Sequence, residues 1–495
     1  MNITPLAQAT SSLSRRTLLI GAAGLTAGLA LPALGVAGAA LAAPALLPLG
    51  AQNPLIRQRA DPHINRHPDG RYLFTASVPE YDRIVLRAAP SLAGLATATE
   101  RTLWVRPPSG TMGGYIWAPE IHQVGGRWYI YFAAGDAGEP FRVRPYVLQA
   151  DGPDPMTANW TVRGRIVTQF DTFSLDATTF SHNGRQYLVW AQGEPGIDAG
   201  SNLYISEMSD PSTLTGPQTR ISVPTASWET RGFKVNEGPS VIIRNDRVFI
   251  SFSASATDAN YCLGLLTANA SADLLSANSW VKSSGPVFVS NDATSQYGPG
   301  HNCFTTAPDG RGGEIDVLVY HAREYRDIPG DPLFDPNRHA RVQRLYWNAD
   351  GTPDFGIPVA AGILPSRLRS HNFPDRFVRH ANYVGRLDAA PKPSVDSWFR
   401  VVEGLAGGNS LESANFPGHY LLAGPSGITL ARSNNTPTFA AAASFTLRAG
   451  LADAAKTSFE SIATPGTYLR HRDYRLYVER VSGTVGAADA TFAID

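Results

Sequence analysis

Apolar and aromatic runs recur at a regular spacing along the first two thirds of the chain, and a short polar turn opens each of them. The turns begin at residues 69, 125, 183, 245 and 312, so that neighbouring turns are 56 to 67 residues apart. The runs after them, such as 128–134, alternate or accumulate Tyr, Phe, Ile and Val as buried strands do. Four short strands with their loops need about this length. The pattern therefore predicts an all-β fold whose first domain is a five-bladed β-propeller.

An acidic residue or a histidine stands about six to twelve residues before each turn. These residues are Asp61, Glu120, Asp176, Glu237 and His301. We interpret them as lying in register, one on the innermost strand of each blade. Inner strands of a propeller surround one axis, so these side chains should converge there.

A different repeat follows a boundary within residues 357–368. Residues 370–380, 413–423 and 461–471 resemble one another, and each copy ends in a small-residue and aromatic segment at 396–399, 442–445 or 489–492. Three β-rich repeats of about 45 residues are typical of a β-trefoil, in which no single copy is stable alone. We expect a propeller over 44–362 and a β-trefoil over 366–495.

The composition narrows the kind of ligand. Forty-two basic and 42 acidic residues give a formal net charge of zero, so the chain shows no electrostatic footprint for nucleic acid or an anionic membrane. Aromatic residues are 10 % of the chain and charged residues 17 %, which favours a neutral, sugar-like ligand. The two cysteines, Cys262 and Cys303, could pair in an oxidising compartment or remain buried thiols.

The N-terminal 43 residues have the features of an export signal. Arg15 and Arg16 precede a Gly- and Ala-rich apolar run that ends near Ala43. The paired arginines and the small residues at 40–42 favour a cleavable twin-arginine signal over a membrane anchor. We expect a periplasmic or extracellular protein with no membrane attachment after cleavage.

Three carboxyl groups are candidates for glycosidic bond hydrolysis: Asp61, Asp176 and Glu237. That reaction needs one protonated and one ionised carboxyl group on either side of the anomeric carbon. Carboxylates brought together at an axis raise one another's pKa, which helps to keep one of them protonated while another is ionised. The alternative is that Asp61 and Asp176 are ordinary turn residues. The residues themselves do not assign the three roles.

The motifs around these residues resemble glycoside hydrolase family 43. They are Arg59–Ile64, Ile116–Ile121, Ser174–Thr178, Asn236–Ser240 and Gly298–Asn302. The resemblance implies a five-bladed propeller that inverts the anomeric centre. It also implies that Asp61 is the general base, Glu237 the general acid and Asp176 the residue that raises the acid's pKa.

Four further residues are expected to bind substrate. Trp117 would stack on a sugar ring, although it could also be a core residue. Glu120 would bind sugar hydroxyls or orient a carboxyl group, or else form a structural ion pair. His301 resembles an axial histidine that often lies beside a water-coordinated calcium ion in this family, or it simply contacts a catalytic carboxylate. Arg323 would reach Asp176 or the substrate. No cofactor is required by this chemistry.

The C-terminal repeats resemble the arabinofuranose-binding AbfB-type trefoil, carbohydrate-binding family 42. That resemblance implies sugar pockets at His380 with Asp396 and at His471 with Asp489. The middle repeat has Ala423 and Ala442 instead, so we expect two sugar sites and not three.

Together the two resemblances imply a secreted, exo-acting α-L-arabinofuranosidase that acts on α-1,5-linked arabinan or a related plant polysaccharide, as a monomer. The alternatives are a β-xylosidase or arabinoxylan debranching enzyme of the same family, or a non-catalytic arabinan-binding lectin. Exo or endo action depends on loops such as 137–145 and 325–337, whose conformation the sequence alone does not predict.

Overall fold

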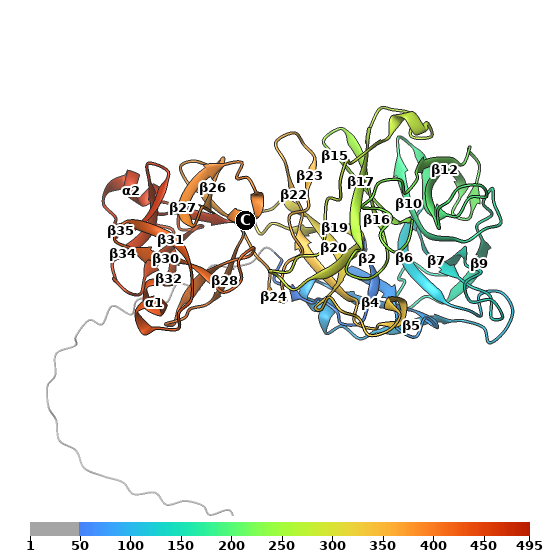
Figure 1. The fold of residues 1–495 in the computed structure, drawn as a ribbon, viewed down its shortest axis with the longest axis horizontal. Helices are drawn as coiled ribbons and strands as arrows, with labels where there is room; N and C mark the ends of the chain where they lie inside the picture. The colour runs from blue at the N-terminus through green and yellow to red at the C-terminus, as the bar shows by residue number, and fades with distance from the viewer. Residues whose placement is uncertain (1–48) are drawn as a thin grey trace, which may run out of the picture. The chain divides into compact units, whose positions relative to one another are not determined.

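The computed structural model describes residues 49–495, and almost all of its regular structure is β-strand. The expected export signal of residues 1–43 lies outside the described residues. Figure 1 shows the strands of the first domain in blue to yellow and those of the second in orange to red. Among residues 49–495, no helix is both long enough and apolar enough to cross a membrane.

Five antiparallel sheets form the first domain, in chain order, and confirm the predicted five-bladed propeller. The first two blades have four strands each: β2 (Ala60–Arg66), β3 (Tyr72–Ser77), β4 (Arg83–Ala89) and β5 (Arg101–Val105), then β6 (Ile116–Val124), β7 (Arg127–Ala134), β8 (Arg144–Ala150) and β9 (Trp160–Arg165). The third contains β10 (Ser174–His182), β11 (Arg185–Gln192), β12 (Asn202–Asp210), β13 (Thr213–Leu214) and β14 (Thr219–Ser222).

The fourth and fifth blades differ in how many strands they have. The fourth contains β15 (Asn236–Arg244), β16 (Arg247–Ala254), β17 (Cys262–Asn269) and β18 (Val281–Lys282). The fifth has only β19 (Tyr297–Pro308), β20 (Glu314–Arg323) and β21 (His339–Arg344).

Short elements lie outside these sheets. Strand β1 (Gln52–Asn53) pairs with β24 (Gly362–Ile363), and β22 (Tyr346–Trp347) pairs with β23 (Pro353–Asp354). Three single 3-10 turns are η1 (Ala93–Ala96), η2 (Ala277–Ser279) and η3 (Pro332–Phe334).

The predicted turns connect the first and second strands of the blades. Gly125 and Gly126 have φ of 56° and 79°, and the equivalent pairs at 183–184 and 245–246 are also positive. Two successive positive φ angles are the mark of the type I′ turn, whose twist matches that of the strands it joins. The strands after these turns are buried on both faces, as in Trp128–Ala134, because each blade packs between two others.

The propeller is closed by the start of the domain. The first strands of the blades, β2, β6, β10, β15 and β19, contact one another in a ring that ends with β19 beside β2. In addition, Ile56 bridges to Ala340 on β21, and the Asn53 side chain hydrogen-bonds both backbone groups of Val342 at 2.9 Å. The segment before the first blade is therefore bonded to the outer strand of the fifth blade.

The second domain contains twelve strands in three repeats of four, as the sequence predicts for a β-trefoil. They are β25 (Leu368–Ser370), β26 (Arg376–Ala381), β27 (Val384–Ala389) and β28 (Phe399–Glu403); β29 (Asn409–Ser413), β30 (His419–Gly424), β31 (Gly427–Arg432) and β32 (Ser444–Ala449); and β33 (Thr457–Ser461), β34 (Thr467–Arg472), β35 (Arg475–Arg480) and β36 (Phe492–Ile494). A short helix precedes the last strand of each repeat: η4 (Ser394–Ser397), α1 (Pro437–Ala442) and α2 (Gly483–Asp489).

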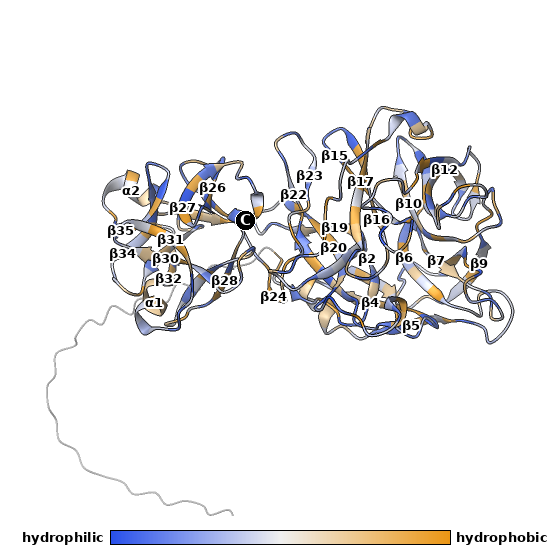
Figure 2. Ribbon diagram, in the orientation of Figure 1, coloured by the Kyte–Doolittle hydropathy of each residue, from blue (hydrophilic) through white to orange (hydrophobic). Residues whose placement is uncertain are grey.

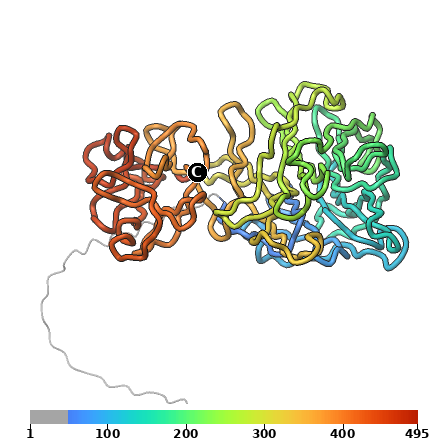
Figure 3. The backbone as a smooth tube through the Cα atoms, viewed as in Figure 1, coloured from blue at the N-terminus to red at the C-terminus, as the bar shows by residue number. Residues whose placement is uncertain are grey.

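One fully buried phenylalanine from each repeat contributes to the trefoil core. Phe399, Phe445 and Phe492 occupy equivalent positions and have no exposed surface. Figure 2 shows hydrophobic residues interspersed with hydrophilic ones along the strands of both domains, and Figure 3 traces the backbone through the same order of repeats. Each repeat thus contributes one third of a shared core, which no repeat contains by itself.

The two cysteines are free and buried. Burial raises the pKa of Cys262 to about 12, and the Cys303 sulfur lies 3.2 Å from the backbone N–H of Ile64. Of the two alternatives left open by the sequence, the structure has the buried thiols.

Candidate active site

A β-bulge with one extra residue interrupts the first strand of every blade. Pairing with the second strand breaks after Ala60, Trp117, Leu175, Glu237 and Gly300. The next residue has a positive φ in all five strands: Asp61 (51°), Ala118 (45°), Asp176 (56°), Gly238 (54°) and His301 (40°). Bulges re-aim side chains, and a positive φ in a residue other than glycine stores strain of the kind found at functional sites.

The bulges correct the predicted register. Asp61, Asp176 and His301 are truly equivalent, as expected. Glu237, however, stands one residue before its bulge position, which is Gly238, and Glu120 stands two residues after Ala118. The five predicted residues are therefore not in register: the bulge position holds Ala118 in the second blade and Gly238 in the fourth, and the carboxyl groups stand two residues after and one residue before it.

A cavity of about 610 Å³ opens at the bulges. Its lining includes Asp61, Asp176, Glu237, His301 and Trp117, which are five of the seven predicted propeller site residues. Glu120 and Arg323 are not among the lining residues. The cavity thus brings together the three carboxyl groups that were proposed from the sequence.

Asp61 is surrounded by basic groups. Its Oδ1 lies 3.4 Å from Arg338 Nη1 and 3.3 Å from His301 Nδ1, and its backbone N–H donates to His321 Nδ1 at 3.1 Å. Burial raises the pKa of a carboxyl group, but Arg338 and then His301 outweigh it and hold the pKa of Asp61 far below its usual range. Asp61 is therefore ionised throughout the working range of pH, as a general base must be.

The pKa values of Glu237 and Asp176 are shifted upwards, opposite to that of Asp61. Burial, and then the nearby Asp176 carboxylate, raise the pKa of Glu237 to about 7. Burial also raises the pKa of Asp176, although His301 lowers it. Asp176 Oδ2 accepts the backbone N–H of Gly238 at 2.9 Å, which fixes it beside the peptide that follows Glu237. Glu237 therefore retains a proton near neutral pH, as a general acid must.

His301 connects two of the carboxyl groups. Its Nδ1 lies 3.3 Å from Asp61 Oδ1 and 3.8 Å from Asp176 Oδ2. Burial lowers the pKa of an imidazole, but these carboxylates raise the pKa of His301 above its ordinary value. The geometry agrees with the simpler of the two sequence hypotheses, a histidine in contact with catalytic carboxylates.

Glu120 lies in a separate group with His63 and His122. Its Oε2 is 2.7 Å from His122 Nε2 and 3.7 Å from His63 Nε2, so the structure favours the ion-pair alternative for this residue. Within residues 49–495, these three side chains form the group that could hold a metal ion. Two imidazoles and one carboxylate suit a transition metal better than calcium, which prefers oxygen ligands. This group therefore does not fit the expected calcium, and His301 is not part of it.

Arg323 does not line the cavity and forms hydrogen bonds with loop residues instead. Its guanidinium donates to Asp335 Oδ1 at 2.9 Å and to the carbonyl oxygens of Thr257 and Pro332 at 2.6 Å. The arginine beside the carboxylates is Arg338, which donates to the Tyr81 hydroxyl at 2.7 Å and which the sequence analysis missed. Arg338 precedes β21 in a loop, where no strand pattern marks it.

Aromatic side chains surround the cavity. The Trp117 ring stacks on Tyr115 at 5.5 Å, and Phe141 lies 5.9 Å from Trp117. Phe141 and Phe233 line the cavity and are 55 % and 64 % exposed. Flat apolar surfaces at a cavity that ends in carboxyl groups suit a sugar, whose C–H faces stack on aromatic rings.

The trefoil contains two matching clusters of polar side chains. In the first, Asn415 Oδ1 lies 3.1 Å from His380 Nε2, Asn415 Nδ2 donates to Asp396 Oδ1 at 2.8 Å, and Arg379 donates to Asp396 Oδ2 at 2.5 Å. Phe416 lies against both His380 and Tyr383. His380 and Asp396 belong to the first repeat, whereas Asn415 and Phe416 belong to the second.

The second cluster repeats this geometry between the third and first repeats. Asn372 lies 3.0 Å from His471 Nε2 and donates to Asp489 Oδ1 at 2.8 Å, and Arg470 donates to Asp489 Oδ2 at 2.6 Å. Phe373 packs against His471 and Tyr474. The sequence analysis found the His and Asp of each cluster but missed the Asn, Phe, Arg and Tyr. The recurring Asn-Phe-Pro at 372–374 and 415–417 could have indicated two of them.

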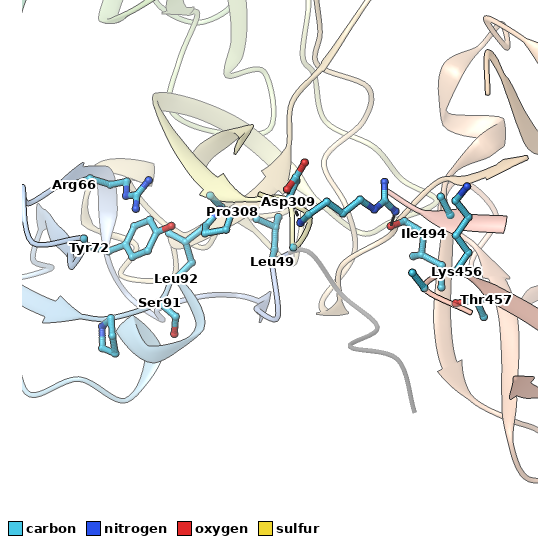
Figure 4. Close-up of a pocket in the computed structure, with 17 residues that line it drawn as sticks. Leu49, Arg66, Tyr72, Ser91, Leu92, Pro308, Asp309, Lys456, Thr457 and Ile494 are labelled. Atoms are coloured by element: carbon cyan, nitrogen blue, oxygen red, sulfur yellow. Dashed lines mark hydrogen bonds between the residues drawn. The ribbon is translucent and has the colours of Figure 1, made fainter. Parts of the chain in front are cut away.

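A further pocket, drawn in Figure 4, has a volume of about 430 Å³ and is lined in part by Arg66, Tyr72 and Asp309. None of the predicted site residues lines it.

Two family models match the chain, one over each of its repeat regions. Residues 51–353 match the glycosyl hydrolases family 43, and residues 366–494 match the alpha-L-arabinofuranosidase B (ABFB) domain. The chain is 53 % identical over 457 residues, 91 % of its length and 94 % of the relative's, to an extracellular exo-alpha-(1->5)-L-arabinofuranosidase of Streptomyces avermitilis. It is 52 % identical to alpha-L-arabinofuranosidase 43 of Humicola insolens over 84 % of this chain and 89 % of that protein.

A solved structure shows the same propeller. The alpha-L-arabinofuranosidase from Lactobacillus brevis is 52 % identical and superposes with a TM-score of 0.60 over 63 % of this chain and 97 % of that one. With the family match spanning more than half of its residues, this chain belongs to family 43 of the glycosyl hydrolases and is a glycoside hydrolase that also contains an AbfB domain.

Proposed function

We propose that the protein is an exported, inverting, exo-acting α-L-arabinofuranosidase that releases arabinose from α-1,5-linked arabinan or a related polysaccharide. Asp61 acts as the general base on water, Glu237 as the general acid, and Asp176 keeps the acid protonated. The observation that carries this proposal is the opposed ionisation of two carboxyl groups in one cavity, with the pKa of Asp61 held low and that of Glu237 raised to about 7.

The mechanism follows from these two protonation states. The Asp61 carboxylate removes a proton from a water molecule as that water attacks the anomeric carbon. Glu237 gives its proton to the leaving oxygen at the same time, so the sugar leaves with inverted configuration. Arg338 and His301 keep Asp61 ionised, and the Asp176 charge favours the protonated form of Glu237.

The names of the relatives support arabinofuranose as the sugar that is released. Two of them are arabinofuranosidases at more than half identity, and the Streptomyces avermitilis relative is named for the α-1,5 linkage. Two trefoil clusters with hydrogen-bonding groups beside an aromatic ring supply binding sites for the same sugar on the polymer. Tethering them to the propeller raises the local concentration of substrate at the active site.

The test is a digest of linear and branched arabinan with product analysis, together with one chromogenic α-L-arabinofuranoside and one β-D-xyloside. We expect arabinose as the sole early product and cleavage of the arabinofuranoside. Oligosaccharides as early products would indicate endo action, and preferential cleavage of the xyloside would indicate a β-xylosidase. Cleavage of neither glycoside with retained arabinan binding would indicate a lectin.

Export by the twin-arginine route is part of the proposal. Its support is the pair Arg15 and Arg16 before an apolar run, and the Streptomyces avermitilis relative is named extracellular. Replacement of both arginines by lysine should keep the protein in the cytoplasm. Unchanged secretion of that variant would point to another route.

The chemistry proposed here uses no cofactor. If the group of His63, Glu120 and His122 holds an ion, that ion acts on the fold and not on the reacting atoms, because none of the three lines the cavity. Extended dialysis against a chelator should therefore leave kcat unchanged at moderate temperature.

A further inference from the structure

A buried tyrosine contacts the proposed general acid. Tyr261 stands immediately before β17, is 2 % exposed, and lines the cavity. Its hydroxyl donates a hydrogen bond to Glu237 Oε1 at 2.7 Å. No motif in the sequence singled out this residue.

The direction of this hydrogen bond determines where the acid keeps its proton. A protonated carboxyl group has one oxygen that bears hydrogen and one that only accepts. Because the Tyr261 hydroxyl donates to Oε1, the transferable proton of Glu237 stays on Oε2. Burial, and then the Glu237 and Asp176 carboxyl groups, raise the pKa of Tyr261 well above its usual value, so the phenol remains a donor before and after proton transfer.

Ser253 connects the strand beside the acid to the His301 bulge. It lies on β16 as the cross-strand partner of Glu237, and its Oγ accepts the backbone N–H of His301 at 2.7 Å. Ser253 therefore ties the backbone opposite Glu237 to the first strand of the fifth blade.

The ring of Tyr261 packs against two residues that are cross-strand partners of each other, His321 and Gly300. It stacks on the His321 imidazole with centroids 5.7 Å apart and planes 3° from parallel. His321 in turn accepts the backbone N–H of Asp61. A Cβ at Gly300 would lie 2.3 Å from ring atoms of Tyr261, so glycine at this position makes the room that the ring needs.

We propose that Tyr261 is a positioning residue for the general acid: its hydroxyl holds Oε1 of Glu237, leaves the proton on Oε2 to face the substrate, and stabilises the carboxylate that remains after proton transfer. This inference rests on the proposed role of Glu237. It adds a residue that never touches the substrate's leaving oxygen itself.

The test is Tyr261→Phe in the full-length protein, with Tyr320→Phe as the matched control. Tyr320 is also a fully buried propeller tyrosine, but its hydroxyl bonds Gln343 at 3.0 Å and not a cavity residue. Positioned acid catalysis contributes roughly 10²- to 10⁴-fold, so Tyr261→Phe should lower kcat/KM on an arabino-oligosaccharide by about tenfold or more. On an aryl arabinofuranoside with an acidic leaving group, which needs little protonation, the loss should be less than about threefold.

The pH profile provides an independent readout. The Tyr261 hydrogen bond favours the ionised form of Glu237, so its loss should move the basic limb of the kcat/KM profile to higher pH. Tyr320→Phe should leave both the profile and the ratio between the two substrates unchanged. Because that ratio and the position of the limb are measured within one preparation, a partly unfolded sample of Tyr261→Phe does not alter them.

Equal losses on the two substrates with an unmoved basic limb would overturn the proposal and leave Tyr261 a packing residue. Glu237→Ala, measured beside it, separates this failure from failure of the proposed function. If Glu237→Ala spares the aryl substrate and Tyr261→Phe does not, only the role of Tyr261 is wrong. If Glu237→Ala itself shows no dependence on the leaving group, the assignment of the acid is wrong.

Discussion

Three buried carboxyl groups share one cavity, and their neighbours determine which of them carries a proton. Asp61 has Arg338, His301 and His321 around it, whereas Glu237 has the Asp176 carboxylate and a phenol. Burial alone would raise the pKa of all three. The basic side chains reverse that effect only at Asp61. Asp61 is therefore suited to the proposed role of base, and Glu237, whose pKa is raised, to that of acid.

Replacing the acid should have an effect that depends on the leaving group. Glu237→Ala should lower kcat on arabinan by about 10²-fold or more, while an aryl arabinofuranoside with an acidic leaving group is largely spared. Asp61→Ala should be equally damaging on both substrates, because every substrate needs an activated water. Steady-state kinetics on the two substrates checks this, and equal loss for both variants on both substrates would contradict the assignment.

The pH dependence should follow the same two groups. Glu237 must be protonated, and its pKa is raised to about 7, so kcat/KM should fall as the pH rises through about 7. Asp61 must be ionised, and its pKa is lowered, so the acidic limb should lie below the ordinary aspartate range of about 3.9. A kcat/KM profile with its basic limb near 4–5 would show that Glu237 is not raised as described.

At the scale of elements, the bulge in the first strand of each blade and the hairpins of the trefoil place the candidate functional side chains. Tyr383 and Tyr474 are the second residues of two-residue hairpins and have φ of 63° and 59°, as in a type I′ turn. They are 52 % and 39 % exposed, and each packs against the phenylalanine of a polar cluster. The middle repeat has Pro425 and Ser426 there, and proline cannot adopt the positive φ that this turn needs. The middle hairpin thus lacks both the turn and the tyrosine of the other two.

Each trefoil cluster is shared between two repeats, which strengthens the expectation of two sugar sites and not three. Each cluster takes His and Asp from one repeat and Asn and Phe from the next. By the same rule, the third position would combine Ala423 and Ala442 with Ala463 and Thr464, none of which can reproduce the hydrogen bonds of the other two. All of the corresponding polar groups are thus missing at that position.

We therefore expect Asp396→Ala and Asp489→Ala each to remove one arabinofuranose site, since a lost hydrogen-bonded pair costs about 1–3 kcal/mol. Each change copies the Ala442 that the middle repeat already has. Affinity electrophoresis on arabinan in a Glu237→Ala background should show weaker retention for each variant and none for the double variant.

Asp453→Ala changes a partly exposed trefoil aspartate whose side chain contacts Lys456 and the backbone N–H of Ala455; it is the matched control and should be retained like the parent. In the active enzyme, none of these changes should alter kcat/KM on a small soluble arabinofuranoside. Retention of the double variant on arabinan would show that other residues make the sites.

At the scale of the whole molecule, the arrangement of the blades sets the distance between the proposed acid and base, which belong to the fourth and first blades. The proposed inversion requires their carboxyl groups to stand about 6.5–9.5 Å apart so that water fits between base and sugar. Proton NMR of a fresh digest should show the β-anomer of arabinose before mutarotation. Early appearance of the α-anomer would indicate a retaining enzyme.

The sequence by itself determined the repeats, the fold class and the identity of the three carboxyl groups. A propeller blade and a trefoil repeat are local units, so their turns and apolar runs leave a period that can be counted. The turn pairs at 125–126 and 183–184 show this, because the positive φ angles that they adopt are a property of two adjacent residues. The paired His and Asp of the trefoil were expected from the family that these repeats resemble.

Only the tertiary structure decided which side chains meet. Glu120 and Arg323 stand in motifs as regular as those of Asp61, yet one pairs with His63 and His122 and the other holds a loop. Arg338 and Tyr261 reach the carboxyl groups from positions that no period marks. The physical reason is that a pKa or a hydrogen bond depends on distances of a few ångströms between blades far apart in sequence. A bulge of one extra residue is enough to change them.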